Sequence, residues 1–362
     1  MGKTAKNKYQ LYRPTLRGRL LLWLLLPLCG WSQKKSSFFG KKVDSSYIQS
    51  YYHELDLGTQ FGSQYMEYRT YYNDTFFISI RPNEVYTLSP SINYRWLSVS
   101  YAFTPEFLEF NNDDSLRGST RFRRLSTSFS FGQLSLSGIW STTRGFYLAN
   151  MPDVYPNWKP GEPYLQFPEM EVKRFILSGV YRTNPNFSIK AINGGEEEQL
   201  RSAWTFLPGL NIMHFKFNVP NGDPQQAGTI ELTNNTDINI VLPIAGTWVF
   251  SRHAYISAAA GPIMGVDFFR SFAIDENNKI VESNGIRFST GFHFGLNIGY
   301  NQPNWYIGFS NLSSSYRHGV SNAERMAKLH TQFALYGGVR IKPPKMLKKS
   351  LDWAEKILPF LK

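Results

Sequence analysis

The sequence predicts an all-β protein, a transmembrane, antiparallel, up-and-down β-barrel of about 12 strands with a short C-terminal amphipathic helix. Three observations predict this class. Aromatic residues make up 16% of the 362 residues, and charged residues only 18%. Apolar and polar side chains alternate along many segments, and the connections between these segments alternate between short and long. A barrel strand shows one face to lipid and the other to water, which explains this mixture of aromatic, small and polar residues.

The amino terminus has the features of a signal peptide. A basic stretch that ends at Arg19 contains no acidic residue, and an apolar run from Leu20 to Leu28 follows it. Gly30 and Ser32 are the small residues that a signal peptidase requires. The run is about half as long as a spanning helix, which needs roughly 20 apolar residues, so export is favoured over a membrane anchor. We therefore expect residues 1–32 to be removed.

Cys29 is the only cysteine in the chain. It could be the acylated cysteine of a lipoprotein, but the bulky Leu28 stands where a small residue is expected. We expect Cys29 to leave with the signal peptide. The mature chain would then contain no disulfide and no thiol chemistry.

The net charge of +12 lies entirely in the two terminal parts of the chain, residues 1–54 and 342–362. The acidic and basic residues of 55–341 balance to zero. A nucleic-acid-binding protein needs a basic patch on its folded body. The charge distribution therefore argues against a nucleic-acid partner.

Alternation is clearest at residues 288–300. Phe288, Phe292 and Ile298 belong to an apolar face, whereas Ser289 and Gly295 belong to the opposite, small and polar face. Period-2 alternation is the signal of a strand with two different environments. A soluble β-sandwich would also show it, but tryptophans near strand ends favour the aromatic girdles of a membrane barrel. These tryptophans are Trp96, Trp140, Trp248 and Trp305.

Twelve strands are expected, an even number as in single-chain bacterial barrels. Their ranges are 55–71, 84–95, 96–105, 120–131, 134–148, 169–183, 187–219, 237–251, 254–270, 285–300, 304–316 and 329–342. Short turns are expected at 95–96, 132–133, 184–186, 251–253 and 301–303. Long loops are expected at 72–83, 106–119, 149–168, 220–236, 271–284 and 317–328. Outer-membrane barrels have short periplasmic turns and longer extracellular loops, so both termini would be periplasmic.

The range 187–219 is longer than one crossing requires. It contains Gly194-Gly195 and the acidic run Glu196 to Glu198. Three consecutive acidic residues do not face lipid at depth. We expect a bulged strand with a local excursion below the membrane, or two short strands in place of one.

The barrel is expected to span 55–342, with a periplasmic N-terminal segment at 33–54. After Pro343-Pro344, apolar residues recur at helical spacing with lysines on another side, which predicts an amphipathic helix over 343–362. This helix could lie on the inner leaflet of the outer membrane. Alternatively, it could pack into or across the periplasmic mouth of the barrel.

Three segments resemble a family of uncharacterised outer-membrane barrels, domain-of-unknown-function family 4421. They are Tyr94-Arg95-Trp96-Leu97 at a turn, Arg144-Gly145-Phe146-Tyr147-Leu148 at a strand end, and the stretch from Phe187 through Glu198-Gln199 to Ser202. The resemblance covers about residues 45–342. It implies an exported barrel and no particular activity.

One constellation could carry chemistry. His318, Ser321 and Asn322 are similar to the His, Ser and Asn of outer-membrane lipid A deacylases and phospholipases, with Glu324 as a third member of the catalytic group. The spacing argues against this, because residues three apart on a strand point to opposite faces. The alternative is a polar extracellular loop.

Several polar residues are expected on the lumen face: Arg124, Arg182, Asp267, His293 and Arg340. The arginines could pair with Asp267 or with the acidic run at 196–198, or they could set an anion preference in a pore. We expect a lumen network. The sequence shows no metal-spaced cluster of His or Cys and no phosphate-binding glycine loop, so we expect neither metal nor cofactor.

We therefore expect a non-enzymatic outer-membrane barrel: a narrow pore, a scaffold or an envelope-interaction protein. An outer-membrane lipid acyl hydrolase that uses Ser321 and His318 is the alternative. The expected partners are outer-membrane lipid, the barrel-assembly machinery and other envelope proteins. Small residues on the inward face, such as Ser126, Ser128 and Gly295, leave space for a water-filled lumen. Long loops or the acidic excursion at 196–198 could plug it.

Overall fold

The computed structural model describes residues 44–71, 76–108, 111, 114–218, 232–274, 280–319 and 325–357. The expected signal peptide and the part of the N-terminal segment up to residue 43 lie outside these residues. So do Ser321, Glu324 and the last residues of the C-terminal helix range.

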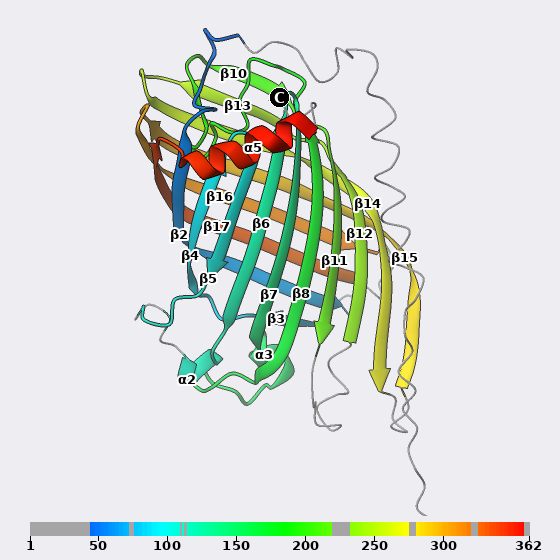
Figure 1. The fold of residues 1–362 in the computed structure, drawn as a ribbon. Coiled ribbons are helices and arrows are strands. Elements are labelled where there is room, and N and C mark those ends of the chain that lie inside the picture. Colours follow the sequence, from blue (N-terminus) through cyan, green and yellow to red (C-terminus); the bar gives the residue numbers. More distant parts are fainter. Residues whose placement is uncertain are drawn as a thin grey trace, which may run out of the picture. The chain divides into compact units, whose positions relative to one another are not determined.

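Twelve crossings form a closed ring in which every neighbour is antiparallel (Figure 1). In ring order the strands are β2 (Leu55–Tyr71), β4 (Tyr86–Tyr94), β5 (Leu97–Phe103), β6 (Arg121–Phe131), β7 (Leu134–Leu148), β8 (Gln166–Tyr181), β11 (Gly209–Asn218), β12 (Leu232–Val241), β14 (Ala254–Ile274), β15 (Ile280–Asn301), β16 (Trp305–His318) and β17 (Arg325–Ile341). The ring closes where β17 pairs with β2 from Leu55↔Ile341 to Tyr71↔Arg325. The expected transmembrane up-and-down barrel is confirmed.

The two ends of the barrel differ. At one end the chain passes between strands through tight turns such as Arg95-Trp96 and Gly132-Gln133, and we call this the turn end. The opposite end, with the longer connections, is the loop end. Strands β14 and β15 extend farther toward the loop end than the sequence predicted, to Ile274 and from Ile280. Their outer parts carry exposed polar pairs such as Arg270 with Glu282 (2.7 Å), which a lipid-facing pattern does not contain.

Two crossings are interrupted by proline. β10 (Ala203–Phe206) continues after Pro208 as β11, and β12 continues after Pro243 as β13 (Ile244–Val249). Because proline lacks an N–H, it removes a ladder hydrogen bond. Pairing resumes across the break, where Leu207 N–H donates to the carbonyl of Pro243 (2.9 Å). Gly261 of β14 faces this kink, and a Cβ there would lie 2.4 Å from Pro243 Cα.

The outer surface is apolar, and every second residue of a strand contributes to it. In β15, Ile286, Phe288 and Ile298 are exposed on the outer face, whereas the inward Ser289 is fully buried. Trp140, Trp248 and Trp305 are exposed as well. Trp96 is only 9% exposed, because it packs in a cluster with Leu351 of the C-terminal helix, so it does not belong to an exposed girdle.

One strand was missed by the sequence analysis. β3 (Phe77–Arg81) lies in the range expected to be the loop 72–83, and it pairs with both β2 and β7. These two strands are separated in the ring by β4, β5 and β6. β3 also covers Glu67, whose carboxylate accepts hydrogen bonds from Arg69 (2.8 Å), Ser79 (2.6 Å) and Arg81 (2.8 Å). The short helices α2 (Asp114–Arg117) and α3 (Met151–Val154) lie in the other loop-end connections.

The range 187–219 does not form one bulged strand. As the alternatives expected, it contains an excursion from the wall, followed by the two short strands β10 and β11. The chain leaves β8 at Tyr181 and returns to the wall only at β10. The expected short turn at 184–186 therefore begins a long excursion. Within it, β9 (Glu197–Gln199) pairs with β1 (Ile48–Ser50) in a separate two-stranded sheet.

The C-terminal helix α5 (Lys345–Ile357) is present and docks at the turn end (Figure 1). Leu351 packs in a cluster with Leu55, Tyr94 and Trp96. Arg95 binds Asp352 (2.7 Å) and Glu355 (3.1 Å) of the helix. Among the described residues, no helix is long and apolar enough to cross a membrane.

If the outer face of β17 contacts lipid, a charged side chain there should lower the free energy of unfolding, and more so the deeper it lies in the membrane. Leu335 and Val339 share the outer face and are 59% and 48% exposed. Leu335→Arg should lower the free energy of unfolding in phospholipid vesicles by about 2–4 kcal/mol, whereas Val339→Arg, near the strand end, should cost about 0–1 kcal/mol. Reversible guanidinium unfolding measures both. Equal, small decreases in the free energy of unfolding at the two positions would contradict a membrane-facing surface.

Candidate functional site

An ionic cluster occupies one side of the lumen toward the loop end. Asp237 of β12, Asp267 of β14 and His318 of β16 are all fully buried, and Lys328 of β17 is 6% exposed. Alternation explains their position: Ile238 and Ile240 face outward, so the adjacent Asp237 and Asn239 face inward. Four different strands thus bring charged groups to one place.

Two buried ion pairs hold the cluster together. Lys328 Nζ donates to Asp237 Oδ2 (3.0 Å), and Arg287 Nη2 donates to Asp267 Oδ2 (3.0 Å). Asn235 Nδ2 also donates to Asp267 Oδ2 (3.1 Å). The second oxygen of each aspartate has no hydrogen-bond partner among the described residues.

His318 lies between the two aspartates. Its Nδ1 is 3.8 Å from Asp237 Oδ1 and 3.7 Å from Asp267 Oδ2, both too long for a hydrogen bond. Both imidazole nitrogens lack a partner within the described part of the chain. His318 is the last residue of β16, whereas the sequence pattern predicted it in the loop 317–328.

Asp237, Asp267 and His318 offer ligand atoms within 4.8 Å of one another, which is a set that could hold a metal ion. The charge balance argues against it. Lys328 and Arg287 already neutralise the two carboxylates, so a divalent cation would add uncompensated charge to a buried site. Water, which both donates and accepts, suits the free carboxylate oxygens and imidazole nitrogens better.

The hydrolase hypothesis required an accessible His318 beside Ser321 and Glu324. Ser321 and Glu324 lie outside the described residues, so their geometry is not described. The His318 imidazole is fully buried against two carboxylates and stacks on Tyr316. This environment does not expose it to a lipid substrate.

The other side of the lumen at the loop end is filled by an apolar cluster, which we call the loop-end core. Tyr68 of β2 and Phe217 of β11 stand six strands apart in the ring, and their ring centroids are 4.9 Å apart. Lys328 Nζ lies 3.4 Å from the centroid of Phe215, where the ionic cluster meets the apolar side. The buried members are Met66, Tyr68, Ile78, Val85, Ala102, Phe122, Phe146, Leu148, Met151, Phe167, Met170, Val172, Phe215, Phe217 and Met326.

The turn end of the lumen is occupied by residues 184–199, which we call the turn-end plug. Phe187 of the plug is fully buried in a cluster with Leu207 of the wall. Tyr255 of β14 donates its hydroxyl to the carbonyl of Ile192 (2.9 Å). Gly194 adopts φ +74°, and a Cβ there would lie 2.1 Å from the ring of Tyr306. The glycine is thus required both for its backbone conformation and for the close approach of the wall.

Glu196 of the plug is a buried acid outside the spanning strands. It pairs with Lys190, whose Nζ also donates to the carbonyl of Arg95 (2.7 Å). Burial raises the pKa of Glu196 from its ordinary 4.5 to about 7, against the opposing effect of Lys190. Glu197 and Asp56 add to the rise through their negative charge. The carboxyl is therefore stabilised in its protonated form within the plug.

The predicted lumen residues point inward but do not form the pairs that we expected. Arg124 donates to Gln332 (3.1 Å), and His293 contacts Ser314 (3.1 Å). Arg182 binds the carbonyls of Gly132 and Phe187. Arg340 binds the carbonyl of Gly195 (2.6 Å) and Asn301 (2.7 Å). Arg182 and Arg340 thus brace turns and the plug through backbone carbonyls, whereas Arg124 binds a side chain of β17.

Between the two ends, the inward face is less densely covered. Leu312 of β16 pairs with Gly295 of β15, and a Cβ on Gly295 would lie 3.6 Å from the Leu312 side chain on the lumen face. Leu312 is nevertheless 44% exposed. The small inward residues expected from the sequence therefore leave free space beside Leu312, between the two filled ends.

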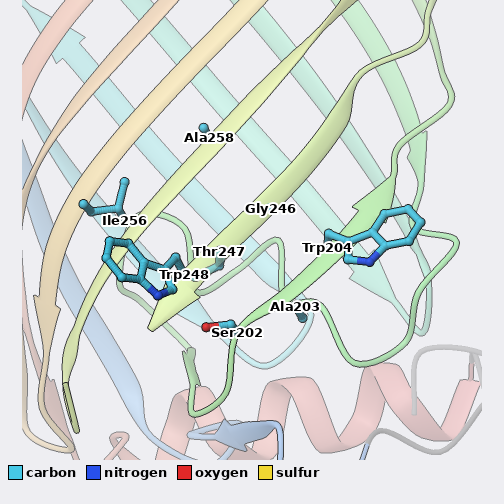
Figure 2. Close-up of a pocket in the computed structure, with 8 residues that line it drawn as sticks. All are labelled: Ser202, Ala203, Trp204, Gly246, Thr247, Trp248, Ile256 and Ala258. Carbon is cyan, nitrogen blue, oxygen red and sulfur yellow. The ribbon is translucent and has the colours of Figure 1, made fainter. Parts of the chain in front are cut away.

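A shallow pocket lies on the outer face near the turn end. Trp204 of β10 and Trp248 of β13 stand on either side of Gly246 (Figure 2). The two indoles are 70% and 61% exposed. Tryptophans at strand ends are typical of the membrane–water boundary.

The sequence did not predict four residues of these sites: Asp237, Arg287, Lys328 and Lys190. Alternation alone would have placed Asp237 and Arg287 inward. Lys328 was assigned to a loop because β17 begins four residues earlier than expected. Lys190 was assigned to a strand that does not form.

The fold and lumen define a transmembrane β-barrel whose interior is occupied by its own side chains and by a segment of its own chain. The chain belongs to the family described as Domain of unknown function (DUF4421), whose model matches residues 42–340. The expected family is thus confirmed. No curated protein matches the chain.

Solved outer-membrane barrels are similar in architecture. The outer membrane protease OmpT of Escherichia coli has 7% identity and a TM-score of 0.40, over 81% of this chain and 98% of that one. The β domain of the Bordetella autotransporter BrkA has 10% identity and a TM-score of 0.32, over 76% and 98%. The toluene transporter TbuX of Ralstonia pickettii has 10% identity and a TM-score of 0.28, over 79% and 90%. At these values the likeness does not extend to any site or activity of this chain.

The ionic cluster predicts a large loss of stability when one member of an ion pair is removed. Lys328→Met leaves Asp237 buried without its cation and should lower the free energy of unfolding by about 3–5 kcal/mol. The double variant Lys328→Met with Asp237→Leu should recover most of that loss, because both charges are gone. Guanidinium unfolding in vesicles measures both. A single variant as stable as the unsubstituted chain would show that the pair is not buried.

The raised pKa of Glu196 predicts that the plug loosens as pH rises. Its folded-state pKa exceeds the unfolded value, so the stability it contributes is present below about 4.5 and is lost as pH rises through about 7. Amide hydrogen exchange of residues 184–199, corrected for intrinsic rates, should show falling protection over this range. Glu196→Gln should flatten the dependence. Protection that rises with pH would mean that the ion pair with Lys190 outweighs burial.

Proposed function

We propose that the protein is a closed, non-enzymatic barrel of the outer membrane that acts as a scaffold or envelope-interaction protein. Residues 1–32 would direct its export, and the turn end would face the periplasm. The apolar exterior, the even ring and the short turns at the end that holds both barrel termini support this orientation. Outer-membrane lipid and the barrel-assembly machinery are its general partners.

One observation supports a closed lumen: side chains from opposite walls of the barrel meet inside it. The contact between Tyr68 and Phe217 spans half the ring, and Lys328 reaches Phe215 from the other side. A water-filled porin keeps such walls apart with a polar interior. The narrow-pore alternative is therefore less well supported than the scaffold.

The turn-end plug closes the lumen a second time. Arg340 and Tyr255 hold its backbone, and Phe187 packs against the wall. A plug fixed by several side chains from different strands resembles a structural element rather than a gate. Its outward surface, together with β1, is the surface that other envelope proteins would meet.

The acyl hydrolase is not supported by the described geometry, because His318 is buried between carboxylates that Lys328 and Arg287 hold. A nucleophile at Ser321 would need that imidazole to be accessible. The purified protein should release no fatty acid from phospholipid or lipid A. Activity that Ser321→Ala abolishes would restore the enzymatic hypothesis.

The closed lumen predicts an electrically silent protein. The full chain in a planar bilayer should give no stepwise conductance. Deletion of residues 187–199 should also be silent, because the loop-end core still closes the barrel. The same deletion with Tyr68→Ser and Phe217→Ser should conduct, since the plug is then absent and the ring contact that joins opposite walls of the loop-end core is lost.

Two outcomes decide the proposal. Stepwise conductance of the unsubstituted chain would identify a pore and contradict the closed scaffold. Conductance after the plug deletion alone would show that the loop-end core does not seal the lumen. Heat-modifiable migration of each variant on a gel confirms that its barrel has folded.

A further inference from the structure

Helix α5 has two distinct apolar stripes. Leu347, Leu351 and Ala354 pack against the turn end of the barrel. Met346, Trp353 and Ile357 are 83%, 66% and 55% exposed. With 3.6 residues per turn, these three exposed side chains lie within about 40° of one another around the helix axis. They form a continuous stripe beside the packed one, and we call it the exposed stripe.

The remaining side of the helix is basic. Lys345, Lys348, Lys349 and Lys356 are all exposed. The two acidic residues of the helix, Asp352 and Glu355, both bind Arg95 at the turn end. Their charge is thereby directed to the barrel, and the outer side of the helix stays positive.

The depth of α5 matches the membrane boundary. The helix packs beside Tyr94 and Phe131, which end β4 and β6 at the turn end. Trp248 and Trp204 lie at the turn-end parts of β13 and β10, with exposed indoles (Figure 2). Leu97 and Phe129 of the outer face are partly covered by the helix cluster. The exposed stripe is thus adjacent to the lipid-facing surface and at the level of its tryptophans.

We propose that α5 is a lipid-binding element that inserts Met346, Trp353 and Ile357 into the leaflet at the turn end and binds anionic phospholipid headgroups with its lysines. An interfacial helix has this combination of a buried apolar side and a basic polar side. Basic residues near a membrane surface favour anionic lipid by about fivefold each. The inference rests on the proposed membrane location and specifies which lipid the protein recognises.

Arg95 fixes the orientation of the helix. It is buried, adopts φ +61° in the β4–β5 turn, and binds both acidic residues of α5. Tyr52 adds a hydrogen bond from its hydroxyl to Glu355 (3.0 Å). These contacts hold the packed stripe against the barrel, so the exposed stripe beside it stays uncovered. The barrel therefore presents the helix to lipid in one fixed rotation.

The test uses environment-sensitive fluorophores on the full chain. Cys29→Ser removes the only native thiol, and single cysteines at Met346 and Lys349 carry the probe. In vesicles of phosphatidylcholine and phosphatidylglycerol, the Met346→Cys probe should be quenched by lipid with a nitroxide on its acyl chain and protected from iodide. The Lys349→Cys probe should show the reverse. Equal access of iodide to both positions would overturn the insertion of the exposed stripe.

Headgroup recognition is measured with the same Met346→Cys probe. Spin-labelled phosphatidylglycerol should quench it at least fivefold more effectively than spin-labelled phosphatidylcholine. Lys345→Gln, Lys348→Gln, Lys349→Gln and Lys356→Gln together should remove this preference. Equal quenching by the two lipids in the chain that keeps its lysines would overturn anionic recognition.

A probe at Phe333→Cys, on the lipid face of β17, separates failure of this inference from failure of the proposed membrane location. Lipid quenching at Phe333 without quenching at Met346 would overturn only the role of α5. Absence of lipid quenching at both positions would contradict the membrane barrel itself.

Discussion

Backbone hydrogen bonding in hydrocarbon is the constraint on which the rest of the structure depends. Each N–H and C=O that enters a bilayer must be satisfied within the protein, so a sheet can cross only as a closed ring. The ladder between β17 and β2 provides that closure along 17 residues of each strand. Closure and alternation together decide where polar side chains go. Asp237, Asp267 and Lys328 cannot face lipid, and they collect in the lumen.

Inside a narrow barrel, polar and aromatic side chains are paired and packed as they are in the interior of a soluble protein. Charges are paired, aromatic rings pack across the lumen, and a segment of the chain fills the remaining mouth. Arg95 connects the parts: its side chain binds α5, and its carbonyl accepts a hydrogen bond from Lys190 of the plug. The β4–β5 turn therefore links the wall, the plug and the C-terminal helix at one point.

The ring was predictable from the sequence because alternation is a local signal, and β2 and β7 begin and end where it indicated. The excursion that forms the plug was predictable from the sequence, but the place where it begins was not, because Phe187, Ile189 and Ala191 alternate like a strand. The glycine pair Gly194-Gly195, which adopts positive φ, and the acidic run at 196–198 signalled the departure from the wall. In the ionic cluster, alternation places Asp237 inward. The contacts of Lys328 with Asp237 and Phe215 depend on how closely opposite walls of the barrel approach each other. No pattern within one strand encodes that distance.

The most direct test of the filled lumen is cross-linking between opposite walls. With Cys29 replaced by serine, cysteines at Tyr68 and Phe217 lie six strands apart in the ring, at side chains whose ring centroids are 4.9 Å apart. A short thiol cross-linker should join them in membranes and shift the migration of the denatured protein on a gel. A control pair at Tyr101 and Ile238, on the outer face, should not react. Failure of the Tyr68–Phe217 pair to cross-link in a folded, heat-modifiable barrel would mean that the walls stand apart and that the lumen is open.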